Sequence, residues 1–196
     1  MNTTLGAIYL DSVVKRLLTY KVLGDRTFDQ LEEKDFYFVP EGGTTGAPGV
    51  GKDSPVSNSI AVIIQHMSGN MMSRWTNFLT EDGEKEGRDR EKEFSEPTLS
   101  REQLLGLWEK GWACLLDALL SLKEEDLQQT IHIRHEPLYA IDAINRQLAH
   151  YPHHVGQIVY IGKMIRNKDW KPLSIARGES GQFNQKMQER HGSSKG

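Results

Sequence analysis

The sequence predicts an all-α fold, a four-helix bundle, and three observations lead to this prediction. Four long stretches of the 196-residue chain carry apolar side chains at helical spacing, so that each has one apolar stripe. The segments between them are mostly rich in glycine or in charged residues, which are typical of loops. A chain of this length also suits one domain, which we expect to span residues 1–196.

The first two helices lie on either side of a glycine-rich segment. The first is expected from about Leu5 to Glu33, and Gly24 with Asp25 can break its tail. The second is expected to begin after Ser54, an N-cap residue followed by proline at the first helical position. Its apolar positions are Ile60, Ile63, Ile64, Met67, Met71, Trp75, Phe78 and Leu79.

The third helix has the clearest start signal in the chain. Ser100 and Gln103 form a capping box, and Leu99 with Leu104 can form a hydrophobic staple across the first turn. Trp108 and Trp112 follow on its apolar stripe, where we expect them in the core together with Trp75 of the second helix.

The fourth helix is expected from about Leu138 to Arg166. Before it, residues 130–134 alternate as TIHIR, which can form a short strand or hairpin between the third and fourth helices. After it, the tail from Lys168 is expected to be mostly irregular and to fold back over the bundle.

Composition limits where the protein works and what it binds. The net charge of −3 argues against nucleic acid as a partner, and no apolar run is long enough for a membrane span. The N-terminus lacks the basic start and the small-residue cleavage site of a signal peptide. One cysteine, Cys114, cannot form an internal disulfide, which fits a reducing cytoplasm, and we expect it to be a small core residue.

Three histidines predict a metal site. His150 and His154 lie four residues apart, so a helix places both imidazoles on one face, where they can bind one ion at about 2.0–2.1 Å. His66 lies among apolar residues of the second helix, where an unpaired imidazole would be costly. Three histidines leave one coordination position open, as catalytic sites do. The alternative is an ordinary buried histidine and a polar helix face.

Neighbouring residues bear on this site. His153 is also within reach by spacing, but His154 is better in register with the inward-facing Gln157, so we expect His153 on the flank. Pro152 lies between the two expected ligands, and proline inside a helix costs about 3 kcal/mol, so the helix either kinks or breaks there. Asn70 and Asn77 can serve the site, whereas His132, His135 and His191 are expected to face solvent.

Two further segments are interpreted without a function. Residues 46–53, GAPGVGKD, match a phosphate-binding P-loop up to the last position, where Asp53 replaces the Ser or Thr that holds magnesium. A flexible linker is therefore the favoured interpretation. The charged residues from Glu81 to Glu93 are interpreted as a solvated face.

Longer segments resemble a known family. NSIAVIIQHMSGNMMSRWTNFLTEDGEK, INRQLAHYPHHVGQIVYIGK and WKPLSIARGES, between Asn58 and Gly181, are similar to a branch of unknown function in the DinB/YfiT-like superfamily. The resemblance implies a four-helix bundle with a long crossover connection, often dimeric. It also implies that His66, His150 and His154 bind a divalent transition metal, zinc or nickel above all. Many members read His-His-Arg-Gly-Gln where this chain has His-His-Val-Gly-Gln at 153–157.

The resemblance implies a metal site more directly than a reaction. Relatives include thiol S-transferases that use bacillithiol or mycothiol, a mycothiol-dependent isomerase and proteins assigned only as metal-dependent hydrolases. We therefore expect a cytoplasmic homodimer in which the metal activates a low-molecular-weight thiol, such as bacillithiol, for attack on a small-molecule electrophile. The alternatives are hydrolysis by metal-bound water and a non-catalytic dimer with a structural or vestigial metal.

Overall fold

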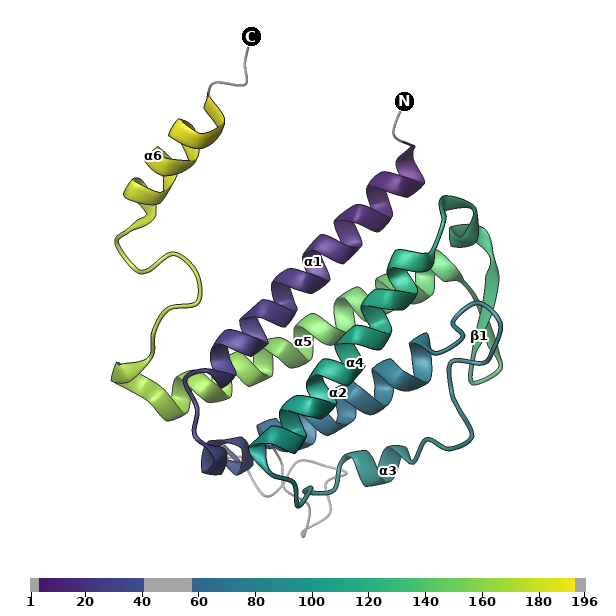
Figure 1. The fold of residues 1–196 in the computed structure, drawn as a ribbon, viewed down its shortest axis with the longest axis horizontal. Helices are drawn as coiled ribbons and strands as arrows, with labels where there is room; N and C mark the ends of the chain where they lie inside the picture. The colour runs from purple at the N-terminus through teal and green to yellow at the C-terminus, as the bar shows by residue number, and fades with distance from the viewer. Residues whose placement is uncertain (1–3, 41–57, 193–196) are drawn as a thin grey trace, which may run out of the picture.

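The fold is built mainly from four long helices, α1 (Leu5–Phe28), α2 (Ile60–Trp75), α4 (Arg101–Ser121) and α5 (Ala140–Arg166) (Figure 1). The computed structural model describes residues 4–40 and 58–192. Within these ranges it also contains two shorter helices, α3 (Arg90–Glu93) and α6 (Ser180–His191), and three 3₁₀ turns, at Glu33–Tyr37, Glu124–Gln128 and Asn167–Asp169. The prediction of an all-α fold is confirmed in the sense that the chain is mostly helical.

The long helices bury their apolar stripes against one another. Helix α2 packs against α4 and α1 against α5, and further contacts join α1 to α4 and α2 to α5. As predicted, three tryptophans lie in the shared core, each at most 2% exposed: Trp75, Trp108 and Trp112. The ring of Tyr151 lies in the same core. Burial of one large apolar side chain stabilises the fold by about 1.5–3 kcal/mol, so this cluster contributes strongly.

Helix α1 is shorter than predicted. It runs through Gly24, which was expected to break it, and stops at Phe28. A Cβ on Gly24 would lie 2.5 Å from Cζ2 of Trp108, so the absence of a side chain there lets α1 and α4 approach closely. The glycine is therefore a contact position and not a helix terminator.

Helix α2 begins later and ends earlier than predicted. Its N-cap is Ser59, whose hydroxyl accepts a hydrogen bond from the backbone N–H of Val62. The expected cap at Ser54 and the P-loop-like segment 46–53 lie outside the described residues. The helix ends at Trp75, so the prediction was wrong to include Phe78 and Leu79, although Phe78 still packs in the core beyond it.

The second half of the chain follows the prediction closely. The capping box of Ser100 and Gln103 starts α4. Two antiparallel strands, β1 (Thr130–Ile133) and β2 (Glu136–Tyr139), then form a hairpin that precedes α5. Helix α5 continues through Pro152 without a break, so the two histidines on either side of the proline share one helix.

The tail differs from its prediction. Residues 180–191 form the helix α6, which lies apart from the four long helices in Figure 1, so the tail is not mostly irregular. A part of it does return to the long helices, because Arg26 of α1 donates hydrogen bonds to the carbonyls of Pro172 and Leu173. No helix in the described parts of the chain has the length and apolar character needed to cross a bilayer.

Candidate metal centre

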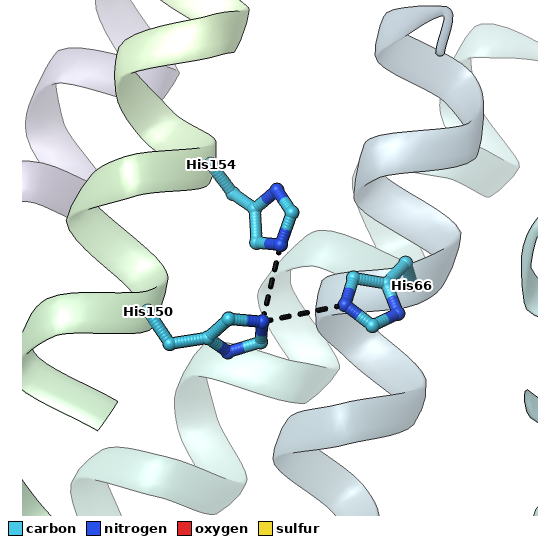
Figure 2. A group of neighbouring side chains, drawn as sticks. All are labelled: His66, His150 and His154. Atoms are coloured by element: carbon cyan, nitrogen blue, oxygen red, sulfur yellow. Dashed lines mark hydrogen bonds between the residues drawn. The ribbon is translucent and has the colours of Figure 1, made fainter. Parts of the chain in front are cut away.

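Three histidines from two helices point at one another (Figure 2). His66 lies on α2, and His150 and His154 lie one turn apart on α5. His66 is 5% exposed, and the two histidines of α5 are half-buried. The structure thus brings together the three residues that the sequence singled out, and it leaves out His153, which is exposed.

The three Nε2 atoms converge with the spacing of metal ligands. Nε2 of His150 lies 3.4 Å from Nε2 of His66 and 3.1 Å from Nε2 of His154. Nitrogens bound to one tetrahedral ion at about 2.0–2.1 Å lie about 3.3 Å apart. All three fall within 4.8 Å of one another, so this geometry fits a metal site.

The opposite nitrogen of each ring is hydrogen-bonded, which fixes the tautomer. Nδ1–H of His66 donates to a carboxylate oxygen of Glu93 at 3.0 Å. On α5, Nδ1–H of His150 donates to Oε1 of Gln147 at 3.3 Å, and that of His154 donates to Oε1 of Gln157 at 2.8 Å. Because these oxygens only accept, each neutral ring carries its proton on Nδ1 and turns a free Nε2 lone pair to the centre. Such partners orient and strengthen metal-binding histidines.

The partner of His66 corrects one prediction from the sequence. Glu93 was interpreted as part of a solvated face, yet it is 7% exposed. Arg88 donates two hydrogen bonds, of 2.7 and 2.8 Å, to the carboxylate of Glu93, and the Arg88 side chain is 4% exposed. Charge-rich composition gave no signal for this burial. Glu93 is buried because α3, the helix that contains it, packs against α2.

Burial disfavours protonation of the two histidines on α5. Burial, followed by the neighbouring imidazoles, lowers the pKa of His150 to about 3. Burial also lowers the pKa of His154 to about 4, against the opposing hydrogen bond to Gln157. Burial alone would raise the pKa of the Glu93 carboxyl, but hydrogen bonds from Arg88 and His66 outweigh it and leave that pKa below its usual value. At neutral pH the two α5 rings are therefore unprotonated, as metal ligands must be.

A cavity of about 420 Å³ opens onto the centre. His66, His150 and His153 line it, together with Asn70 and Gln147. Five arginines complete its charged lining: Arg74, Arg88, Arg90, Arg134 and Arg146. No aspartate or glutamate is among the described residues of the lining. A ligand bound at the histidines would thus occupy a small cationic chamber.

Buried polar groups tie α2 to α5 beside the centre. Nε1–H of Trp75 donates to the hydroxyl of Tyr151, which donates in turn to Oδ1 of Asn70, each at 2.9 Å. Asn70 therefore serves the site, as expected, by holding the two helices in register. The same expectation was wrong for Asn77, whose amide bonds Glu81 at the surface beyond α2.

The remaining candidates lie away from the centre. His132, His135 and His191 face solvent, as predicted. Cys114 is half-buried, with its thiol 3.6 Å from the hydroxyl of Thr76, and it lines a different hollow at the far end of α2. The histidine centre is therefore the cluster of metal-ligating side chains that stands out in the described ranges.

Sequence reasoning missed Glu93 and Arg88, but it could have found Gln147. Gln147 precedes His150 by three residues and Gln157 follows His154 by three, which is the spacing of neighbours on a helix.

Comparison with known proteins identifies a family for this chain. No curated protein and no solved structure matches the chain. A family model does match, over residues 4–179, and the chain belongs to that family, which is described as a protein of unknown function (DUF1572).

Proposed function

We propose that this protein is a metal-dependent enzyme of the DinB/YfiT-like type, a four-helix bundle in which His66, His150 and His154 hold a divalent transition metal, zinc or nickel. One observation carries the proposal: three Nε2 atoms meet at 3.1 and 3.4 Å while each Nδ1 is engaged by its own acceptor. Three unprotonated nitrogens this close repel one another unless a cation lies between them.

The cavity supports a catalytic role over a structural one. A metal that closes its shell with four protein ligands is typically structural, whereas three ligands and an open position are typical of catalysis. In the described part of the chain the group contains three ligands and no fourth. Since His66 and His150 both line the 420 Å³ cavity, the open position faces a space that suits a small molecule.

Thiol S-transfer is the reaction that this lining supports best. A divalent cation held by the three imidazoles would let a thiol react as its thiolate at neutral pH, with the thiol proton passing to water. The sulfur would form an S–C bond to an electrophilic carbon, and the leaving group on that carbon would depart with its electron pair. The chain's own part is to orient the thiol and the electrophile, and this chemistry needs no carboxylate base, in keeping with the lining.

Hydrolysis is the second candidate, and His153 is the observation that favours it. Water attack usually needs a base beside the metal. His153 lines the cavity, and its Nε2 accepts a hydrogen bond of 3.3 Å from the amide of Gln157. The same amide group accepts from His154, so Gln157 couples the two histidines.

Metal analysis of protein without a histidine tag tests the proposal. We expect close to one equivalent of zinc or nickel, and we expect His66→Ala and His154→Ala each to abolish binding. His153→Ala is the matched control and should bind metal normally. Failure of the wild-type protein to take up added zinc or nickel would contradict the proposal.

One assay separates the two reactions. The metal-loaded protein is incubated with a generic electrophile, such as an aryl chloride, with and without a low-molecular-weight thiol. Turnover that needs the thiol supports S-transfer, with bacillithiol as one thiol to test. Turnover that is independent of thiol, and lost in His153→Ala, would support hydrolysis instead.

We propose further that the enzyme is a cytoplasmic homodimer acting on a small molecule and not on nucleic acid or membranes. Apolar side chains on α1 support the dimer, because Ile8, Leu18 and Val22 are 41–51% exposed. Leu18 and Val22 share one face of the helix. Sedimentation of the wild-type protein and of Val22→Asp tests this, and the variant is expected to be monomeric.

A further inference from the structure

Two facing helices carry the same order of side chains beside the histidine centre. On α2, His66, Asn70 and Arg74 lie at intervals of four, and on α5 His154, His150 and Arg146 do the same in the reverse direction. Intervals of four form one stripe on a helix. The helices run antiparallel (Figure 1), so the histidines meet at one end of the pair of stripes and the arginines follow at the other.

Positive charge in this cavity exceeds what its surroundings neutralise. Behind the wall, Glu84 is shared by three arginines: Arg74 at 2.8 Å, Arg134 at 3.2 Å and Arg88 at 3.3 Å. Arg88 also donates two hydrogen bonds to Glu93, whose carboxylate accepts a third from His66. These two carboxylates therefore pair with Arg74, Arg88 and Arg134, and Arg90 and Arg146 are left with one more distant carboxylate each.

Arg90 and Arg146 are the two arginines of this lining whose side chains pair with neither Glu84 nor Glu93. Within residues 4–40 and 58–192, neither makes a hydrogen bond. Each has one carboxylate at 3.8 Å, and those partners are open to solvent, Glu91 at 92% and Glu136 at 64% side-chain exposure. Exposed pairs of this kind contribute about 0–1 kcal/mol, so they compete weakly with a ligand.

Their positions differ from those of purely structural arginines. Arg146 lies one turn before His150 on the same face of α5, with its side chain half exposed. Arg90 lies on α3, across the cavity, where its guanidinium rests on the ring of Phe94 at 5.0 Å. Phe94 in turn stacks on the imidazole of His66, with ring centroids 4.6 Å apart. Both cations are thus held beside the metal ligands.

We propose that Arg90 and Arg146 bind an anionic group of the substrate, a carboxylate or a phosphate, while its reacting atom lies at the histidine centre. The forked guanidinium group matches both oxyanions and binds them with charge-assisted hydrogen bonds. The placement of the reacting atom rests on the proposed function. The anion site itself rests only on the arginines, so the two can fail separately.

Calorimetric titration of the full chain tests the anion site. The probes are succinate for a carboxylate and glycerol phosphate for a phosphate, with succinamide and glycerol as neutral counterparts. Each is titrated into zinc-loaded and into metal-free protein. We expect one or both anions to bind and the neutral compounds not to bind. The anion that binds more tightly identifies the anionic group that the substrate carries.

Variants assign that binding to the two arginines. Arg146→Gln and Arg90→Gln should each weaken anion binding by about tenfold or more, the size of one charge-assisted hydrogen bond. Their affinity for zinc should stay within about twofold, because neither residue contacts the histidines' Nδ1 atoms. Arg16→Gln is the matched control, because this substitution removes the same charge from a residue that is exposed on α1.

The outcomes separate the two proposals. Anion binding that is equally strong in the Arg146, Arg90 and Arg16 variants would overturn the anion site and leave the metal proposal intact. Absence of binding by either anion to both forms of the protein would overturn it as well. Anion binding to a protein that takes up no metal, lost in Arg146→Gln, would support the anion site while contradicting the metal centre.

Discussion

Gly69 and Glu93 fit together so closely that a methyl group on the first would displace the carboxylate of the second. A Cβ built on Gly69 would lie 2.1 Å from Oε1 of Glu93. Gly69 follows His66 by three residues, so it is a neighbour of His66 on the surface of α2. The missing side chain provides the space through which Glu93 reaches the imidazole of His66 at 3.0 Å.

Gly69→Ala is therefore expected to weaken metal binding without unfolding the protein. The obstructed atom is the end of a side chain, which can move, but the moved carboxylate loses its hydrogen bond to His66. Loss of such a partner typically costs 10–100-fold in metal affinity, so we expect about that loss in a zinc competition titration.

Gly106→Ala is the matched control for that substitution. Gly106 also lies within a helix, α4, but a Cβ there meets no atom within 4 Å. We expect unchanged zinc affinity and a free energy of unfolding higher by about 0.4–1 kcal/mol, because alanine restricts the unfolded chain. Equal zinc affinities for the two alanine variants would show that Glu93 does not support the centre.

The buried pair of Arg88 and Glu93 predicts a non-additive result. Removing one partner of a buried ion pair typically costs about 3–5 kcal/mol, because the other charge is left without compensation. We expect Arg88→Met to lower the free energy of unfolding of the zinc-free protein by about that amount, measured with urea. Adding Glu93→Gln to it should restore part of the loss, since the stranded charge is gone.

Arg134 provides the comparison for this double-variant experiment. It also contacts Glu84, at 3.2 Å, but its side chain is 55% exposed. Exposed pairs contribute about 0–1 kcal/mol, so Arg134→Met should change stability by no more than that. If the double variant is as unstable as the sum of its single variants, the two side chains do not act as a pair.

Acid is expected to destabilise the zinc-free protein through its histidines. Burial, more than the neighbouring imidazoles, lowers the pKa of His150 to about 3, and burial lowers that of His154 to about 4, whereas both titrate near 6.5 when unfolded. The unfolded chain therefore binds more protons below pH 6.5. Stability is fully present above that pH and declines as the pH falls toward 4 and 3.

Urea unfolding between about pH 7 and pH 5.5 measures this dependence, because ordinary carboxyl groups are still almost fully ionised there. The slope of the free energy of unfolding against pH should approach two protons for the wild-type protein and one proton for His150→Gln. His135→Gln is the control, since that side chain is 99% exposed. An unchanged slope in His150→Gln would contradict the prediction.

The helices and the three histidines could be predicted because their signals are local. Period 3.6 and the capping box of Ser100 and Gln103 depend on residues within one or two turns. The pair of His150 and His154 is likewise set by helix geometry. The prediction that His66 joins this pair came from the apolar surroundings of His66 and from the resemblance to a known family.

The features that the sequence could not reveal depend on contacts between distant segments. The close approach of α1 to α4 depends on Gly24 meeting Trp108. The role of Glu93 depends on α3 packing against α2, and a run of charged residues has the composition of a solvated loop wherever it lies. The arginine lining likewise gathers side chains from α2, α3, the hairpin and α5, which no spacing connects.

Pro152 gives the last prediction, because α5 tolerates it between two ligands. Proline has no N–H to donate to the carbonyl of Leu148, yet the helix runs unbroken from Ala140 to Arg166. The sequence left open whether the helix kinks or breaks there, and the structure excludes the break. Each flanking histidine is also held by a glutamine on the side away from the proline, His150 by Gln147 and His154 by Gln157.

Pro152→Ala should therefore separate stability from metal binding. The new N–H can complete the helical hydrogen bond, so we expect the free energy of unfolding of the zinc-free protein to rise by about 1–3 kcal/mol. Zinc affinity should stay within about threefold, because the glutamines and not the proline orient the rings. A loss of zinc affinity beyond tenfold would mean that the backbone at Pro152 sets the spacing of the two ligands. The proline would then favour metal binding at the expense of stability.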